Sequence, residues 1–234
     1  MPKKIGIIGA MSVELEFLKS KLEENSAETK AGGMTFTEGK INGSSVVLVQ
    51  SGVGKVNAAL CAQRLILQFG CTHIINTGIA GAMAFGLKVL DFVASTDAVY
   101  HDMDATGFGY KKTEIPQMKC SDFPADGKML EAARSAFKEF PAEHKLVFGR
   151  IATGDQFVSD KEKKSAIQET CSPACVEMEG AAVAHACWIN EIPFVIIRCM
   201  SDMADDDGES TYSFNENEAA SLSGSLVLSM LGRF

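Results

Sequence analysis

The sequence lacks a hydrophobic run long enough to cross a membrane. None of the apolar stretches in its 234 residues approaches the ~20 residues of a spanning helix. The apolar stretch near the amino terminus stops at Ser12 and Glu14, and no small-residue cleavage pattern follows it. It therefore predicts a buried strand rather than a signal peptide. These absences argue against a membrane protein and favour a cytoplasmic location.

Positive charge is scarce as well. The 22 Lys and Arg residues are outnumbered by 30 Asp and Glu residues, which gives a formal net charge of −8 at pH 7. An acidic protein repels phosphate backbones and anionic lipids, so nucleic acid and membrane surfaces are poor partners. We expect a small-molecule substrate that carries little negative charge or that meets a local cluster of donors.

Motifs for disulfides and metal sites are also missing. The chain has seven Cys, an odd number, and no C-x-x-C pair, which favours reduced thiols in the core over disulfides or zinc. The acidic stretch 202–208 does not match a calcium-binding loop. Segment 101–104 has no second ligand cluster to support a metal. The sequence therefore predicts no metal and no cofactor.

Strand-like and helix-like segments alternate along the chain, without repeats or low-complexity stretches. Strands are predicted at 4–8, 34–39, 45–50, 73–77, 91–94, 146–152, 174–177 and 193–200. Helices are predicted at 13–22, 56–69, 129–140, 180–189 and 215–231. Apolar strands that alternate with helices are typical of a mixed or parallel sheet covered on both faces. We predict one α/β domain over residues 1–234.

In such sheets, ligands bind at the carboxyl ends of the strands. The segments expected there are 9–14, 51–54, 77–81, 153–157, 176–179 and 198–202. Two of them are glycine loops, but segment 52–57 has Asn57 in place of the third glycine of a dinucleotide fingerprint. Lys55 is followed by Val56 rather than Ser or Thr, so it is not a phosphate-binding P-loop either. Tight turns are the better interpretation.

Carboxylates are the stronger signal at these strand ends. Glu177 and Glu179 lie two residues apart after an apolar strand, which would place both on one face of it. Burial at the mouth of a strand raises the pKa of a carboxyl group. We therefore predict general acid–base chemistry by Glu14, Glu179 and Asp202 in one cleft. A surface acid that caps a helix is a fair alternative for Glu177 or Asp205.

A series of motifs runs in order along almost the whole chain. They occupy residues 5–11 with Glu14, 51–56, 75–78, 100–104 with 108–110, 154–157, 176–179, 193–195 and 198–202. Taken together they resemble the nucleoside phosphorylase/nucleosidase superfamily, and within it the 5′-methylthioadenosine/S-adenosylhomocysteine nucleosidases. The resemblance implies a three-layer α/β/α fold with a central mixed, mostly parallel twisted sheet.

The resemblance also implies an activity and a role for each site residue. It implies hydrolysis of 5′-methylthioadenosine and S-adenosylhomocysteine, with 5′-deoxyadenosine as a further candidate, to adenine and the 5′-substituted ribose in methionine salvage. Asp202 would protonate adenine N7, Glu14 would activate the attacking water, and Glu179 would bind ribose hydroxyls above Met178. Phe157 would stack on adenine, and the backbone of Val158 would pair with its edge. The remaining wall residues would be Met11, Val53, Ile79, Ala80, Gly81, Glu177, Arg198, Ser201 and Phe214.

The chemistry agrees with these residue types. A ribosyl bond breaks through an oxocarbenium-like state, which nearby carboxylates stabilise. An Asp with a free pKa of ~3.9 is a poor acid at neutral pH unless burial raises that pKa. Phosphate would need cationic or hydroxyl ligands and would be repelled by Glu14 and Glu179. Water is therefore the predicted nucleophile.

Two positions depart from the family pattern and leave alternatives open. Ile79 stands where many relatives have Ser, and Ala105 stands where a larger aliphatic residue is common. A related purine nucleosidase or phosphorylase such as futalosine hydrolase, or a nucleoside-binding protein without turnover, remains a candidate. The resemblance further implies a homodimer in which the loop at residues 100–110 crosses the interface. Phe108 and Pro116 would then cover the 5′-substituent of the neighbour's substrate, unless the aromatic residues of this loop pack within their own subunit.

Overall fold

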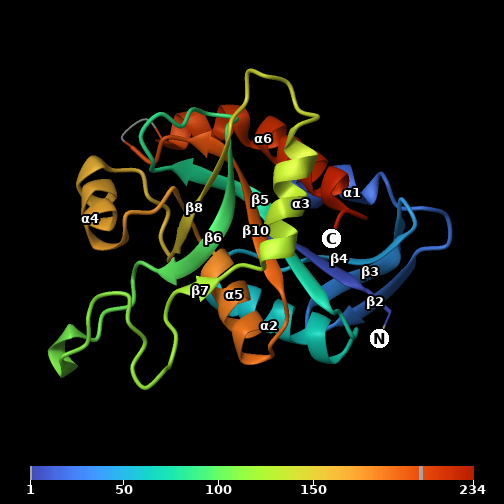
Figure 1. Cartoon of the computed structure of the whole chain (residues 1–234), viewed down its shortest axis with the longest axis horizontal. Helices are drawn as coiled ribbons and strands as arrows, with labels where there is room; N and C mark the ends of the chain where they lie inside the picture. Colours follow the sequence, from blue (N-terminus) through green and yellow to red (C-terminus); the bar gives the residue numbers. More distant parts are fainter. Residues whose placement is uncertain (1, 206–207) are drawn as a thin grey trace.

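One ten-stranded sheet forms the centre of the structure, a computed structural model that describes residues 2–205 and 208–234 (Figure 1). The strands are β1 Ile5–Gly9, β2 Ala27–Ala31, β3 Met34–Ile41, β4 Ser44–Gln50, β5 His73–Ala82, β6 Phe92–Tyr100, β7 Phe123–Pro124, β8 Leu146–Thr153, β9 Cys175–Glu177 and β10 Phe194–Asp202. The helices are α1 Val13–Lys19, α2 Lys55–Leu67, α3 Gly127–Phe137, α4 Lys161–Cys171, α5 Gly180–Ile189 and α6 Gly208–Met230. Residues 206 and 207 of the acidic stretch lie outside the described residues.

The sheet is mixed, as predicted. Strands β4, β1, β5 and β10 pair in parallel, and so do β6, β8 and β9. Antiparallel pairings join β10 to β6, β5 to β9, and β2 through β3 to β4. Because β5 pairs with both β9 and β10, the strands β5, β10, β6, β8 and β9 form a closed ring of pairings. This closure brings the carboxyl ends of several strands to one place.

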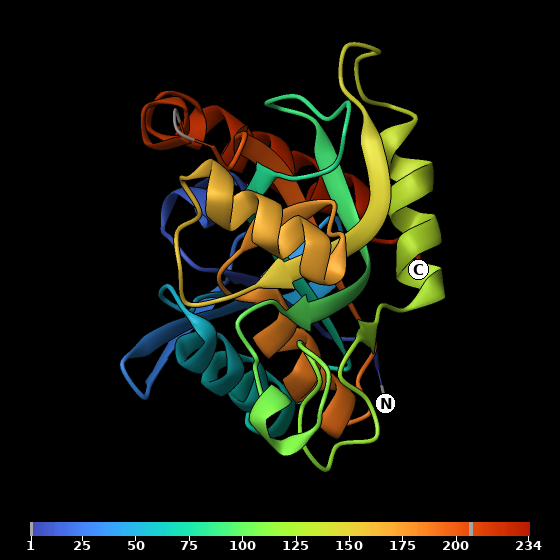
Figure 2. The same ribbon diagram turned by 90° about the vertical axis from the view of Figure 1, so that its left-hand side faces the viewer.

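Alternating side chains along the strands build a core on each face of the sheet. In β1, Ile8 joins the core beneath α2 and α5, whereas Ile5 and Ile7 join the core beneath α1, α3 and α6. Figures 1 and 2 show these two groups of helices on opposite sides of the sheet. The predicted covering of both faces is therefore confirmed. None of the helices in the described residues has the length and apolar character to span a membrane.

The hairpin predicted at Asn42-Gly43 is present between β3 and β4. Asn42 has φ 48° and Gly43 has φ 74°, the positive angles that a two-residue turn of this kind requires. The segment at 78–81, by contrast, was expected as a glycine loop and is the second half of β5. Its backbone pairs with β10 up to Gly81, and the absence of side chains at Gly78 leaves room for Glu14 and Arg198 beside it.

Candidate active site

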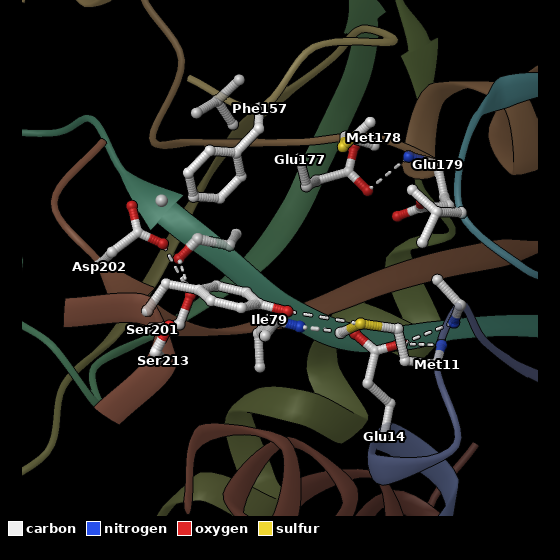
Figure 3. Close-up of a pocket in the computed structure, with 16 residues that line it drawn as sticks. Met11, Glu14, Ile79, Phe157, Glu177, Met178, Glu179, Ser201, Asp202 and Ser213 are labelled. Carbon is white, nitrogen blue, oxygen red and sulfur yellow. Dashed lines mark hydrogen bonds between the residues drawn. The ribbon is translucent and has the colours of Figure 1, made fainter. Parts of the chain in front are cut away.

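A cavity of about 440 Å³ opens at the carboxyl ends of β1, β5, β9 and β10 (Figure 3). The carboxyl ends of parallel strands are where α/β sheets bind ligands. The lining residues are Ala10, Met11, Glu14, Val53, Ile79, Ala80, Gly81, Phe157, Val176, Glu177, Met178, Glu179, Ser201, Asp202, Tyr212 and Ser213. The cavity therefore gathers side chains from segments that are far apart in the sequence.

Glu14 lies in the first turn of α1 and reaches back over the end of β1. Its Oε2 accepts N–H bonds from Ala10 at 2.6 Å and Met11 at 2.9 Å, and its Oε1 accepts one from Ile79 at 3.1 Å. Burial raises the pKa of Glu14, although the charge of Arg198 and the three amides oppose the rise. These bonds fix the carboxyl group at the cavity wall, where it can take up a proton.

A buried arginine lies among the carboxyl groups of Glu14, Glu177 and Glu179. Arg198, from the middle of β10, is 1% exposed and forms an ion pair with Glu177. Its Nη2 donates to Asn76 Oδ1 at 2.6 Å and lies 3.8 Å from Glu179 Oε2. Glu14 is close enough to interact with the same guanidinium electrostatically. One cation therefore serves three buried carboxylates, which leaves a surplus of negative charge when all are ionised.

Glu177 caps a helix but is not a surface residue. Its Oε2 accepts the amides of Glu179 at 3.1 Å and Gly180 at 2.7 Å at the start of α5, and Thr153 donates its hydroxyl to Oε1. The side chain is buried and forms an ion pair with Arg198. The alternative of a surface acid is therefore wrong for Glu177, which lines the cavity and also accepts amides at the start of α5.

Glu179 does not share a strand with Glu177, as the spacing had suggested. Strand β9 ends at Glu177, and Glu179 is the residue that precedes the first turn of α5. Its Oε1 accepts the amide of Gly54 at 2.9 Å. Burial and the neighbouring Glu177 raise the pKa of Glu179 to about 7, although Arg198 acts to lower it. Near neutral pH the Glu179 carboxyl group is therefore protonated in some molecules and ionised in the others.

Asp202 ends β10 and lies across the cavity from Glu14 and Glu179 (Figure 3). It is 2% exposed; its Oδ2 accepts the hydroxyl of Ser201 at 2.8 Å and its Oδ1 accepts the amide of Ala204 at 2.8 Å. Burial raises the pKa of Asp202, although these two hydrogen bonds act to lower it. The group keeps its proton to higher pH than an exposed Asp, as a general acid must.

Aromatic side chains form the apolar wall near Asp202. Phe157, in the loop after β8, is 42% exposed and meets Tyr212 edge to face with ring centroids 5.6 Å apart. The Tyr212 hydroxyl donates to Glu216 Oε1 at 3.0 Å and lies 3.5 Å from the sulfur of Met11. Such a wall suits a flat, largely apolar ligand.

Most of the predicted site residues line this cavity. They are Met11, Glu14, Val53, Ile79, Ala80, Gly81, Phe157, Glu177, Met178, Glu179, Ser201 and Asp202. Val158 lines a small adjoining cavity of about 30 Å³, and Arg198 lies behind the wall as the partner of Glu177. Phe108 and Pro116 lie in the segment between β6 and β7 and do not contribute to the lining.

Phe214 does not line the cavity, and its neighbours take the place predicted for it. Its side chain is 87% exposed, whereas Tyr212 and Ser213 of the same helix line the wall. Successive residues of a helix are rotated by about 100°, so one helix cannot turn all three toward the cavity. The sequence reasoning missed Tyr212 and Ser213, and also Ala10 and Val176, which adjoin predicted residues in the chain.

Metal-ligating side chains do not gather anywhere in residues 2–205 and 208–234 in the groups of three or more that a metal ion needs. All seven cysteines are unpaired, and six of them are buried. The carboxyl groups that line the cavity are those of Glu14, Glu177, Glu179 and Asp202.

Comparison with known proteins agrees with this geometry. The model of the phosphorylase superfamily matches residues 4–232. The 5′-methylthioadenosine/S-adenosylhomocysteine nucleosidase of Colwellia psychrerythraea is 41% identical over 235 residues, covering 98% of this chain and 96% of the relative. The chain belongs to this nucleosidase family of the phosphorylase superfamily.

Two solved structures superpose on this chain over almost its whole length. A Colwellia psychrerythraea nucleosidase of the same name, crystallised in complex with adenine, superposes with a TM-score of 0.95 at 40% identity, covering 100% of this chain and 96% of that one. A futalosine hydrolase mutant of Helicobacter pylori superposes with a TM-score of 0.93 at 29% identity, covering 99% and 100%. The superfamily fold predicted from the motifs is thereby confirmed.

Proposed function

We propose that the chain hydrolyses the N-glycosidic bond of 5′-methylthioadenosine and S-adenosylhomocysteine, releasing adenine and the 5′-substituted ribose, with residues 1–234 acting as one nucleosidase domain. The observation that carries this proposal is a group of three carboxyl side chains on one side of the cavity and a single buried carboxyl group on the other. We call Glu14, Glu177 and Glu179 with Arg198 the ribose end, and Asp202 with Ser201 and Ala204 the base end. The similar Colwellia structure contains adenine, which supports a purine as the leaving group.

At the base end, Asp202 acts as the general acid. Its proton passes to adenine N7 while the electron pair of the C1′–N9 bond remains with the base. Adenine then leaves as a neutral molecule, which lowers the barrier to breaking the bond. Phe157 stacks on the adenine ring, and the backbone of Val158 pairs with its edge. A buried Asp suits this step because burial raises its pKa, so it keeps its proton to higher pH than an exposed Asp does.

At the ribose end, carboxylates stabilise the positive charge that develops at C1′. Water adds to this carbon and loses a proton to Glu14. Hydrogen bonds from three backbone amides hold the Glu14 carboxylate in place. Glu179 accepts hydrogen bonds from the ribose hydroxyls, above Met178. The surplus of carboxylates over guanidinium at this end disfavours a phosphate dianion, because like charges in a buried site repel strongly. Hydrolysis is therefore favoured over phosphorolysis.

We also propose that the chain forms a homodimer through the faces of α2 and α5. Val56, Leu60 and Leu67 of α2 are 56–71% exposed, and Ile189 at the end of the neighbouring α5 is 66% exposed. Apolar side chains gathered on one face are costly to leave in water. This face starts beside Val53, which lines the cavity and is half exposed. A partner seated on it would come close to the cavity mouth.

In this dimer, Phe108 and Pro116 of one protomer would cover the 5′-substituent bound by the other. Phe108 is 87% exposed in the short turn Thr106–Phe108, as a residue that reaches a partner would be. Tyr100 belongs to β6 rather than to this loop; it is buried, with its hydroxyl 3.2 Å from His185 Nδ1. The proposed place of the reaction is methionine salvage in the cytoplasm.

Release of free adenine tests the proposed function. The protein is mixed with 5′-methylthioadenosine, S-adenosylhomocysteine, 5′-deoxyadenosine or futalosine in phosphate-free buffer with a chelator, and purine bases are separated by chromatography. We expect adenine from the 5′-thio nucleosides. A base released from futalosine alone would favour the futalosine hydrolase alternative, which the similar Helicobacter pylori structure supports. Binding without any release would favour a nucleoside-binding protein.

A further inference from the structure

Three loops that follow different strands meet at Lys55, the first residue of α2. Its Nζ lies 2.5 Å from Asp102 Oδ2, in the loop after β6, and 3.5 Å from Asp155 Oδ2, in the loop after β8. We call these three residues the Lys55 junction. The junction lies outside the cavity lining, and the proposed chemistry makes no use of it.

Backbone groups reinforce the same junction. Asp155 Oδ1 accepts the amide of Lys55 at 2.9 Å, and Asp102 Oδ2 accepts the amide of Asp155 at 3.1 Å. The adjacent amide, that of Gly54, donates to Glu179 Oε1 at 2.9 Å. Two consecutive amides at the start of α2 therefore bind different parts of the molecule. The amide of Gly54 binds Glu179 at the ribose end, and the amide of Lys55 binds Asp155 in the loop after β8.

A positive side chain at this position is unfavourable for α2 by itself. The N-terminus of a helix carries partial positive charge, so a lysine in the first turn is destabilising unless anions offset it. The two carboxylates supply that offset, and the side chains of Lys55 and Asp102 are only 26% and 16% exposed. The packing behind them is also tight, because a Cβ at Gly154 would lie 2.3 Å from His101 Nε2. The stability of α2 alone therefore does not explain a lysine at position 55. Its ion pairs with the loops after β6 and β8 do explain it.

The loop after β8 needs such a restraint. Residues 154–158 form no helix or strand, and Phe157 is 42% exposed and meets Tyr212 only edge to face. Core packing therefore fixes Phe157 weakly, and Asp155 is two residues away from it in the chain. We propose that Lys55, Asp102 and Asp155 are positioning residues that hold Phe157 in place to bind the purine ring. This assignment rests on the proposed function, because the purine is its ligand.

The test is the substitution Lys55→Met, with Lys4→Met as a matched control. Lys4 pairs with Glu38 at 2.5 Å and is also 26% exposed, but it lies one residue before β1. For Lys55→Met we expect KM for 5′-methylthioadenosine and the dissociation constant for adenine to rise together, roughly 5- to 30-fold, with kcat within about threefold. Lys4→Met leaves all three constants unchanged, and Lys55→Arg restores most of the affinity.

Hydrogen exchange provides a readout that does not depend on turnover. Amides of residues 154–158 should exchange faster in Lys55→Met than in the wild type or in Lys4→Met, while amides of β1 and β4 stay protected. Asp155→Asn, at a half-exposed position, should produce the same pattern if Lys55→Met does not fold. If the wild-type protein released no base from any nucleoside, the proposed function would fail and exchange would still test the restraint.

Three results would overturn the inference. They are unchanged exchange at 154–158, a fall in kcat with unchanged KM and adenine affinity, or an equal loss in Lys4→Met. The last of these would reveal general destabilisation rather than a restraint on one loop.

Discussion

The ribose end and the base end of the cavity bury their carboxyl groups to a similar depth but under different local charge. At the ribose end, three carboxylates surround the guanidinium of Arg198, which is 1% exposed. At the base end, Asp202 forms its hydrogen bonds with neutral groups, a serine hydroxyl and a backbone amide. Burial alone therefore does not distinguish the two ends.

The difference in local charge is consistent with the opposite chemical roles that we propose for the two ends. A guanidinium favours the ionised form of a nearby carboxyl group, whereas neutral donors offset the cost of ionisation less. Burial raises the pKa of carboxyl groups at both ends, and at the ribose end the charge of Arg198 opposes that rise. In the proposed reaction the ribose end holds negative charge next to a developing cation and the base end delivers a proton.

Asp202→Asn should remove the proton donor of the base end and leave the ribose end unchanged. Of the substitutions considered, it should have the largest effect on turnover. The amide keeps the shape and the hydrogen-bonding oxygen but has no acidic proton to give. We expect kcat for 5′-methylthioadenosine to fall roughly 10²–10⁴-fold, with the thermal unfolding transition and much of the nucleoside affinity retained. Steady-state kinetics and binding calorimetry measure the two quantities. A variant with nearly normal kcat would remove Asp202 from the role of acid.

Arg198→Met should break the ribose end by removing its cation. Three carboxylates would then be buried without a counter-charge, so we expect the free energy of unfolding to fall by about 3–5 kcal/mol. Arg150→Met is the matched control, because Arg150 pairs with Asp97 at 2.5 Å but is 32% exposed, and should cost at most about 1 kcal/mol. Chemical denaturation of both variants gives the comparison, and equal losses would contradict it.

Glu179 should make stability depend on pH. Its pKa is about 7 in the folded chain against an ordinary 4.5, so the folded state binds the proton more tightly. The resulting stabilisation is complete below pH 4.5 and is lost as pH rises through 7, on the order of 3 kcal/mol. Denaturation at several pH values should reveal this slope, and Glu179→Gln should flatten it. An unchanged slope in the variant would assign the effect to another group.

Ser201→Ala should have the smallest effect on turnover of these substitutions. It tests whether the neutral hydrogen-bond donor at the base end controls the pKa of Asp202. The Ser201 hydroxyl stabilises ionised Asp202, so its removal raises the pKa of the acid further. Turnover falls as pH rises through that pKa, because the acid must be protonated. The alkaline limb of the kcat profile should therefore move to higher pH, with a change in kcat of only a few-fold. A shift toward lower pH would contradict the role given to Asp202.

The sequence was sufficient to predict those parts of the fold whose hydrophobic pattern is strong. The apolar strands and the helices that cover them follow from periodicity, and the hairpin follows from Asn42-Gly43. Strand β2 was not predicted, because its residues are exposed and pair only with β3 at the sheet edge. Helix α4 was missed as well, since only Ile167 and Cys171 of its residues are buried.

The site was predictable in its residues and less so in its geometry. Motif spacing predicted a shared cleft for Glu14, Glu179 and Asp202, and the structure gathers them around one cavity. The path of the backbone between neighbours was not predictable. The turn after Glu177 depends on hydrogen bonds from the amides two and three residues later. The direction of Phe214 depends on how the packing of α6 rotates that helix.

The identity of the sugar product tests the proposed reaction most directly. The protein is incubated with 5′-methylthioadenosine in buffer with and without inorganic phosphate, and the sugar is analysed by mass spectrometry. We predict adenine and free 5-methylthioribose in equal amounts, at a rate that phosphate does not increase. A sugar 1-phosphate, or turnover that begins only when phosphate is added, would contradict hydrolysis and the proposed role of Glu14 as the base that activates water.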